Sequence, residues 1–177
     1  MSVNLTRLLA GLGLCAGLAA PVHAQYRTEF ATGWGDDDTQ MYRLGLARDW
    51  QRAWFTDGDW QLGGYWLAEV GYWDSDERHA DNDSLWEVGL TPVFRLEPKA
   101  GHVRPYLEAG VGGHVLSDTR IGGRELSTAW QFGSHLGAGI SCGRFDIGYR
   151  FQHLSNANIK NPNDGIDFHS LNASLRW

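Results

Sequence analysis

The chain has 177 residues, a formal net charge of −6, nine tryptophans and 23 glycines. Its acidity argues against nucleic acid as a partner, because proteins that bind phosphate backbones carry an excess of Lys and Arg. After the N-terminal leader no segment holds 18 consecutive apolar residues, so the sequence predicts no membrane-spanning helix. Transmembrane β-barrels stay open, since their alternating strands give only a weak hydropathy signal.

Residues 1–24 have the pattern of a secretory signal peptide. Arg7 supplies the positive charge, an apolar run covers residues 8–20, and a small-residue cleavage site lies at 22–24. We expect residues 25–177 to form one domain. Loss of Arg7 with the leader makes the net charge of this domain −7.

Eight segments of alternating polar and apolar residues follow, as expected for strands whose successive side chains point to opposite faces. In chain order they cover residues 26–35, 40–50, 60–73, 84–96, 103–115, 128–141, 144–154 and 166–177. Each is at least as long as the 9–11 residues that a tilted strand needs to cross a bilayer. The pattern predicts an all-β fold, an eight-stranded antiparallel transmembrane β-barrel of outer-membrane type, with both termini on the periplasmic side.

The polar faces of these segments carry both signs of charge. They include Arg27, Arg43, Arg95, Arg104, Arg144 and Arg150 together with Glu29, Asp49, Glu69, Glu87, Glu108 and Asp146. A soluble barrel would expose these charges, whereas a membrane barrel would pair them inside and turn its apolar face to lipid. Alternation by itself leaves the choice open. The leader, the tryptophan content and the strand lengths favour the membrane barrel.

The connections and the tryptophans are consistent with that orientation. The connections at 74–83, 116–127 and 155–165 are on balance longer than the alternate ones, as is typical of external loops. Tryptophans are expected at both interfaces of a membrane barrel. We place Trp34, Trp73 and Trp86 near the external ends of the strands, and Trp50, Trp60 and Trp177 near the periplasmic ends.

His153 and Ser155 continue the apolar face of the segment at 144–154 to its external end, so we expect both to face outward. Asp167 has outward parity in the last segment, and the intervening hairpin brings it towards His153. A serine hydroxyl becomes a nucleophile when a base removes its proton, and a histidine base is oriented by a carboxylate. The pattern predicts a hydrolase with Ser155 as nucleophile, His153 as base and Asp167 as acid. Ordinary polar residues at the interface are the alternative interpretation.

Other residues near this position widen the choice. The loop offers backbone N–H groups and the side chains of Asn156 and Asn163 as candidates for an oxyanion hole. Asp164 is a second candidate acid, and His169, which is also outward by parity, is a second candidate base.

The sequence predicts no metal centre and no cofactor. The acidic segments at 36–38 and 74–83 are a weak hypothesis for divalent-cation binding, since solvated external loops often have this composition. No group of His, Cys, Asp and Glu has the spacing of a zinc site.

The C-terminal region resembles the signature of the PagL family of lipid A 3-O-deacylases. The similarity lies in His-Leu-Ser-Asn-Ala at 153–157, Lys160 and Pro-Asn-Asp-Gly-Ile at 162–166. A looser resemblance covers residues 42–46, 64–66 and 105–110.

The resemblance implies an outer-membrane barrel that hydrolyses the ester-linked acyl chain at position 3 of lipid A without a cofactor. It implies Ser155 as nucleophile and His153 as base, and it matches Asn156 and Asn163 to positions around the oxyanion hole. The family has Glu where this chain has Asp167, which is shorter by one methylene.

The implied partners are lipid A, as part of lipopolysaccharide, and the outer membrane itself; a homodimer is left open. The rival functions are another lipid enzyme on a similar barrel, such as a phospholipase or an acyltransferase, and a non-enzymatic structural or adhesive barrel.

Overall fold

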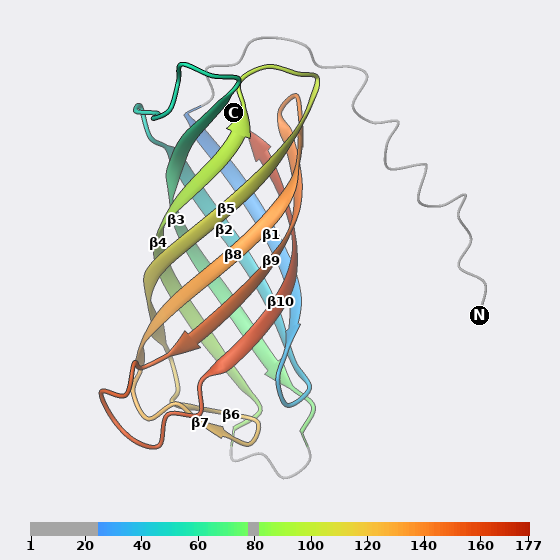
Figure 1. The fold of residues 1–177 in the computed structure, drawn as a ribbon. Coiled ribbons are helices and arrows are strands. Elements are labelled where there is room, and N and C mark those ends of the chain that lie inside the picture. The colour runs from blue at the N-terminus through green and yellow to red at the C-terminus, as the bar shows by residue number, and fades with distance from the viewer. Residues whose placement is uncertain (1–24, 78–81) are drawn as a thin grey trace, which may run out of the picture.

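Eight strands close into an antiparallel barrel in the computed structural model, which describes residues 25–77 and 82–177 (Figure 1). The barrel strands are β1 (Tyr26–Gly35), β2 (Thr39–Asp49), β3 (Trp60–Ser75), β4 (Ser84–Pro98), β5 (Val103–Leu116), β8 (Trp130–Cys142), β9 (Phe145–Ser155) and β10 (Ile166–Arg176). Their order around the barrel is β1-β10-β9-β8-β5-β4-β3-β2. The predicted fold class is therefore confirmed, while the predicted leader at 1–24 lies outside the described residues.

The connection between β5 and β8 contains an element that the sequence did not predict. Two short strands, β6 (Arg120–Ile121) and β7 (Arg124–Glu125), form a separate two-stranded sheet at the end of the barrel opposite the C-terminus (Figure 1). Strands of two residues are too short to show an alternating pattern in the sequence. No helix in the described part of the chain is long and apolar enough to cross a membrane.

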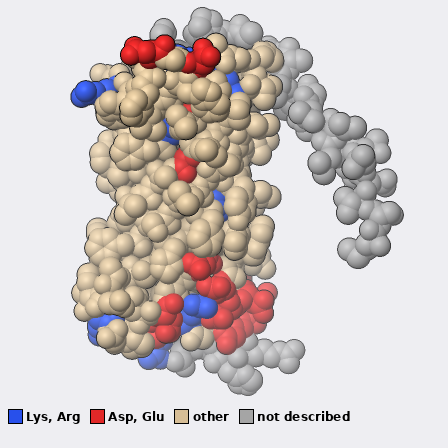
Figure 2. Space-filling model, in the orientation of Figure 1, with Lys and Arg blue, Asp and Glu red and all other residues tan. Residues whose placement is uncertain are grey.

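The two faces of the barrel wall are inverted relative to a soluble protein. Leu136 and Val111 are 67% and 64% exposed, whereas Glu87 and Arg150 are 0% and 2% exposed. Figure 2 shows that most charged side chains visible on one face of the molecule lie near its two ends. An apolar exterior around a polar interior is the arrangement of a membrane barrel, which decides the choice that alternation left open.

Ion pairs fill the barrel interior. Arg150 lies 2.9 Å from Glu29 and 2.8 Å from Glu108, joining strands that are far apart in the sequence. Arg95 similarly pairs with Asp146 at 2.9 Å. Buried charges are tolerated when they are paired and hydrogen-bonded, because each partner replaces part of the other's lost hydration.

An apolar cluster closes the barrel at the end where β9 finishes and β10 starts. It contains Met41, Trp73, Leu85, Leu116, Ile121, Leu126, Leu154, Ile166 and Phe168. Ile121 and Leu126 belong to the β6–β7 region, so this hairpin is packed onto the barrel rather than projecting freely. The cluster also holds the ends of β9 and β10, on which the predicted site residues lie.

The expectation that Trp73 belongs to an aromatic belt is wrong. Trp73 is fully buried, and its Nε1 donates a 2.8 Å hydrogen bond to Glu87 Oε2 inside the barrel. Trp66 on the same strand is 49% exposed, and an odd separation of seven residues turns Trp73 to the opposite face. Trp34 and Trp86 are exposed, as expected at the external end.

Candidate active site

The strand pair β9–β10 places His153 and Asp167 on the outer surface of the barrel. These residues are direct partners in the antiparallel register. Their neighbours Leu154 and Ile166 point inward and are buried in the apolar cluster. Because side chains alternate along a strand, burial of these neighbours fixes His153 and Asp167 on the outward face.

A short hydrogen bond joins the predicted base and acid. His153 Nδ1 lies 2.6 Å from Asp167 Oδ1, and the two side chains are 46% and 42% exposed. Cβ atoms of directly opposed residues lie about 4.5–5.5 Å apart. The shorter side chain of Asp167 therefore reaches the imidazole without an intervening water.

Ser155 is the last residue of β9, two residues beyond His153 and on the same face. Nδ1 of His153 is hydrogen-bonded to Asp167, so Nε2 is the ring nitrogen that could contact the serine. Among the hydrogen bonds of residues 25–77 and 82–177, none joins Ser155 Oγ to His153. Residues i and i+2 of a strand are roughly 6.6 Å apart, and catalytic hydrogen bonds often shorten only when substrate binds.

Gly165 packs against the ring of His153. A Cβ atom at this position would lie 3.0 Å from His153 Cε1, and the φ angle of +64° falls in the left-handed region. Only glycine adopts this conformation without a steric penalty. The last residue of the loop therefore shapes one wall of the histidine environment.

The alternative acid and base make other contacts. Asp164 Oδ2 accepts a 2.8 Å hydrogen bond from the backbone N–H of Glu125 in β7. His169 Nδ1 lies 2.5 Å from the hydroxyl of Tyr149, and its ring stacks on Trp34 with centroids 6.0 Å apart. These contacts leave Asp167 and His153 as the acid–base pair that the structure brings together.

The two asparagines hold the β9–β10 loop. Asn156 is fully buried, and its Nδ2 donates to the carbonyl oxygens of Leu126 and Lys160 at 2.9 and 2.8 Å. The backbone N–H of Asn156 donates to Asn163 Oδ1 at 3.0 Å. Both side-chain protons of Asn156 are thereby engaged within the protein.

Asn163 is the better of the two candidates for the oxyanion hole. Its side chain is partly exposed, and its Nδ2 donates to Asn158 Oδ1 at 3.2 Å. An amide nitrogen carries two protons, so one donor of Asn163 is not used by that contact.

Asp36 and Arg124 contact the site in ways that sequence reasoning missed. Asp36 Oδ2 accepts a 3.0 Å hydrogen bond from the backbone N–H of Asp167. Arg124 forms ion pairs with Asp36 and Asp37 at 3.4 and 2.8 Å. The acidic run at 36–38 had suggested cation binding, and a protein cation occupies that position here. The second acidic segment, 74–83, lies partly outside the described residues.

A shallow groove starts beside the site on the lipid-facing surface. Phe151, two residues before His153 on the same face, lines it together with Leu136, Val111 and Phe94 from neighbouring strands. Gly110 contributes to its floor. The groove offers an apolar surface on the barrel wall that begins next to the strand position of His153.

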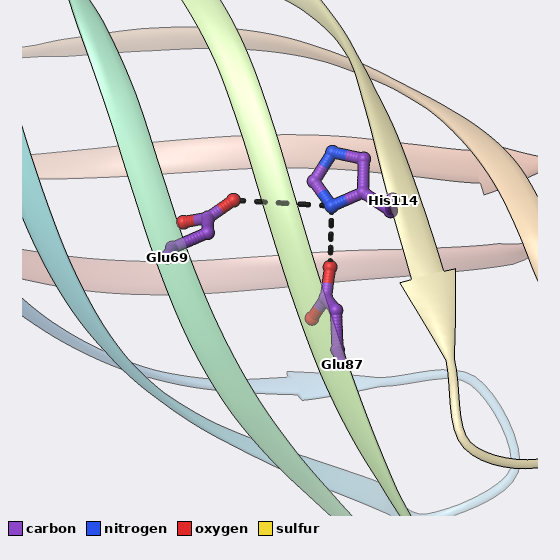
Figure 3. Close-up of side chains that lie close together, drawn as sticks. All are labelled: Glu69, Glu87 and His114. Atoms are coloured by element: carbon purple, nitrogen blue, oxygen red, sulfur yellow. Dashed lines mark hydrogen bonds and ion pairs between the residues drawn. The ribbon is translucent and has the colours of Figure 1, made fainter.

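A separate cluster inside the barrel has a metal-compatible set of donors. Figure 3 shows Glu69, Glu87 and His114 converging from β3, β4 and β5. His114 Nδ1 lies 2.6 Å from Glu87 Oε1 and 4.0 Å from Glu69 Oε1. In a tetrahedral metal site with bonds of about 2.0–2.1 Å, two ligand atoms lie roughly 3.3 Å apart. The first of the two separations given above is shorter than this distance, and the second is longer.

Glu87 is already satisfied without an ion. Its two oxygens accept hydrogen bonds from Arg43 Nε at 2.8 Å and Arg43 Nη2 at 3.0 Å, in addition to those from Trp73 and His114. The arrangement is that of a hydrogen-bonded charge cluster in which the Arg43 cation compensates the carboxylate, and it supplies no chemistry to the outer surface.

Comparison with known proteins points to one family. A family model described as "Lipid A 3-O-deacylase (PagL)" matches residues 40–176. Lipid A deacylase PagL of Pseudomonas aeruginosa is 35% identical over 164 residues, covering 92% of this chain and 90% of that protein. Lipid A deacylase PagL of Bordetella bronchiseptica is 36% identical over 125 residues, covering 66% and 68%.

A solved structure shows the same architecture. The crystal structure of the outer membrane enzyme PagL superimposes with a TM-score of 0.79 at 33% identity, covering 85% of this chain and 99% of that one. The match to the family model over most of the barrel, together with this fold, identifies the family. The chain belongs to the PagL family of lipid A 3-O-deacylases, which are ester hydrolases of the outer membrane.

Proposed function

We propose that Ser155, His153 and Asp167 form the triad that removes the 3-O-linked acyl chain of lipid A. His153 Nε2 takes the hydroxyl proton of Ser155 while Ser155 Oγ attacks the ester carbonyl. The tetrahedral intermediate collapses to an acyl-enzyme, and His153 returns the proton to the departing sugar hydroxyl. Water activated by His153 then attacks the acyl-enzyme and releases a 3-hydroxy fatty acid.

The observation that carries this assignment is the 2.6 Å contact between His153 Nδ1 and Asp167 Oδ1 on the outward face of the barrel. The carboxylate fixes the ring so that its other nitrogen is free, and it stabilises the imidazolium that forms during attack. Ser155 is on the same face of the same strand end. An ester at the level of the outer leaflet can approach this surface directly from the membrane.

The apolar groove supports a lipid substrate. Phe151 and Leu136 lie on its wall close to His153, and the groove continues away from the triad towards Phe94. We assign it to the acyl chain that is being removed, because burial of methylene groups against such a surface is favourable by roughly 0.8 kcal/mol for each CH₂.

The oxyanion hole draws on the loop. We assign the second Nδ2 proton of Asn163 to the developing negative charge on the ester oxygen. Asn156 contributes indirectly by positioning Asn163. Its side-chain amide donates to the carbonyl oxygens of Leu126 and Lys160, and its backbone N–H donates to Asn163.

The same proposal covers export and assembly. Residues 1–24 direct the chain across the inner membrane and are removed, and the barrel of residues 25–177 inserts in the outer membrane. Lipid A, within lipopolysaccharide, is the partner that the chemistry requires. All three triad residues come from one chain, so the chemistry does not depend on the homodimer that the sequence left open.

The test is the mass of lipid A from cells that express the wild-type chain or Ser155→Ala. We expect loss of one 3-hydroxyacyl group with the wild type only. Ser134→Ala is the matched control, since Ser134 is the direct cross-strand partner of His153 on β8. Loss of activity in Ser134→Ala with retention in Ser155→Ala would reassign the nucleophile. Phospholipid cleavage or acyl gain in place of deacylation would favour the rival lipid enzymes.

A further inference from the structure

The β6–β7 hairpin contacts two segments next to the triad acid: the residues just before β10 and the turn between β1 and β2. Arg124 Nη1 donates to the carbonyl oxygen of Gly165 at 2.9 Å, two residues before Asp167. The same guanidinium pairs with Asp36 and Asp37 in the turn between β1 and β2. This side chain is only 22% exposed, so these partners surround it.

Asp36 in turn contacts Asp167 through two hydrogen bonds. The backbone N–H of Asp167 donates to Asp36 Oδ2 at 3.0 Å, and the backbone N–H of Asp36 donates to the Asp167 carbonyl at 3.2 Å. Asp36 Oδ2 is also the atom that faces Arg124 Nη2 at 3.4 Å. One carboxylate oxygen therefore connects Arg124 to the backbone of the triad acid.

A second connection runs through the loop. The backbone N–H of Glu125 donates to Asp164 Oδ2, and the backbone N–H of Asp164 donates to the Glu125 carbonyl at 3.3 Å. Together with the Arg124–Gly165 bond, this pairs the hairpin with the residues that precede β10. Gly165 in turn packs against the ring of His153.

We propose that Arg124 is a positioning residue for the deacylation reaction. It holds the start of β10, and with it the carboxylate of Asp167, in register with His153. This inference rests on the proposed function of the triad. Arg124 acts through Asp36 and Gly165 and touches neither the nucleophile nor the base.

Arginine suits this position because its planar guanidinium presents five donors in fixed directions. The guanidinium donates a hydrogen bond to one carbonyl and forms ion pairs with two carboxylates, and these groups come from two different connections of the barrel. A lysine ammonium can satisfy only part of this set, and methionine satisfies none of it while keeping a similar apolar stem.

The experiment compares Arg124→Met, Arg124→Lys and the control Arg120→Met in purified full-length protein, with lipopolysaccharide in detergent micelles. Arg120 lies on the same hairpin and pairs with Glu125 at 2.5 Å. We expect Arg124→Met to lower kcat about tenfold with KM changed less than twofold, since misplacing a catalytic group by about 1 Å costs up to about 100-fold. Arg124→Lys should recover part of the loss, and Arg120→Met should stay within twofold of the wild type.

A double-mutant cycle separates positioning from general destabilisation. If Arg124 acts through the triad acid, Arg124→Met adds less than twofold to the loss already caused by Asp167→Asn. A merely structural role would lower kcat by the same factor in both backgrounds, which would overturn the inference. Mobility of the folded barrel on unheated gels gives the fraction folded for each variant. Asp36→Asn, which removes the carboxylate charge that lies between Arg124 and the backbone of Asp167, is the second variant if Arg124→Met does not fold, and it should also lower kcat.

The outcomes distinguish this inference from the proposed function. A loss in Asp167→Asn with wild-type kcat in Arg124→Met and Asp36→Asn would reject positioning by Arg124 and leave the triad intact. Full activity in Asp167→Asn would reject the triad acid and the inference together.

Discussion

Replacement of Asp167 by Asn tests the acid–base pair most directly. The change keeps the shape of the side chain and removes its charge, so the 2.6 Å contact with His153 Nδ1 loses its electrostatic part. The loss is felt in the transition state, where His153 is an imidazolium. Opposite charges roughly 4 Å apart attract by about 1 kcal/mol in water and about 4 kcal/mol at an effective dielectric constant near 20.

The exposure of the pair sets the magnitude between those limits. The two side chains are 46% and 42% exposed, so we take a value near the middle, about 2.5 kcal/mol. That energy corresponds to a decrease in kcat of about 70-fold. The same calculation predicts a smaller loss than for a fully buried triad, where an equivalent substitution costs about 10⁴-fold.

The assay is release of 3-hydroxy fatty acid from lipopolysaccharide at saturating substrate, measured by mass spectrometry. Asp167→Glu is the matched control, because it keeps the charge and lengthens the side chain by one methylene. We expect it to retain most of the activity, since both side chains have room at the surface to adjust. A kcat for Asp167→Asn within threefold of the wild type would refute the assignment, since it would limit the contribution of the carboxylate to about 0.7 kcal/mol.

Three further substitutions probe the surroundings of the site. Gly165→Ala should lower both activity and stability, because a Cβ would lie 3.0 Å from His153 Cε1 and the φ angle of +64° costs an alanine about 1 kcal/mol; kcat and urea unfolding measure the two effects. Asn156→Ala should destabilise the barrel by about 2 kcal/mol by leaving buried carbonyl groups unpaired, and unchanged unfolding would contradict the role of the loop. Glu87→Gln should destabilise by about 3 kcal/mol, because Arg43 is left as an uncompensated buried charge, whereas kcat per folded molecule should stay near the wild-type value.

Alternation in the sequence was sufficient to predict the barrel wall. It placed the eight strands to within a few residues and gave His153, Ser155 and Asp167 the same outward face. This worked because the side-chain period of a strand is two, so one well-placed segment fixes the face of every residue in it. The method failed at Trp73, where a strand with apolar residues on both faces gave an ambiguous parity.

The register of β9 against β10 was only partly accessible from the sequence. A hairpin brings Asp167 near His153, but the loop length alone does not say whether the two residues are direct partners. The paired backbone shows that they are, which explains how the short side chain of Asp167 reaches the His153 ring. The competing candidates Asp164 and His169 make other contacts, with Glu125 and Tyr149.

By itself, the sequence determined the fold class, the outward face of His153, Ser155 and Asp167, and the family resemblance, because all three are read from local patterns along the chain. Only the tertiary structure decided which groups contact the segments that carry these three residues. The β6–β7 hairpin is too short to show periodicity, and Arg124 meets Asp36 across the end of the barrel from a distant part of the chain. Such contacts depend on how loops fold over a closed sheet, which no local pattern of residues encodes.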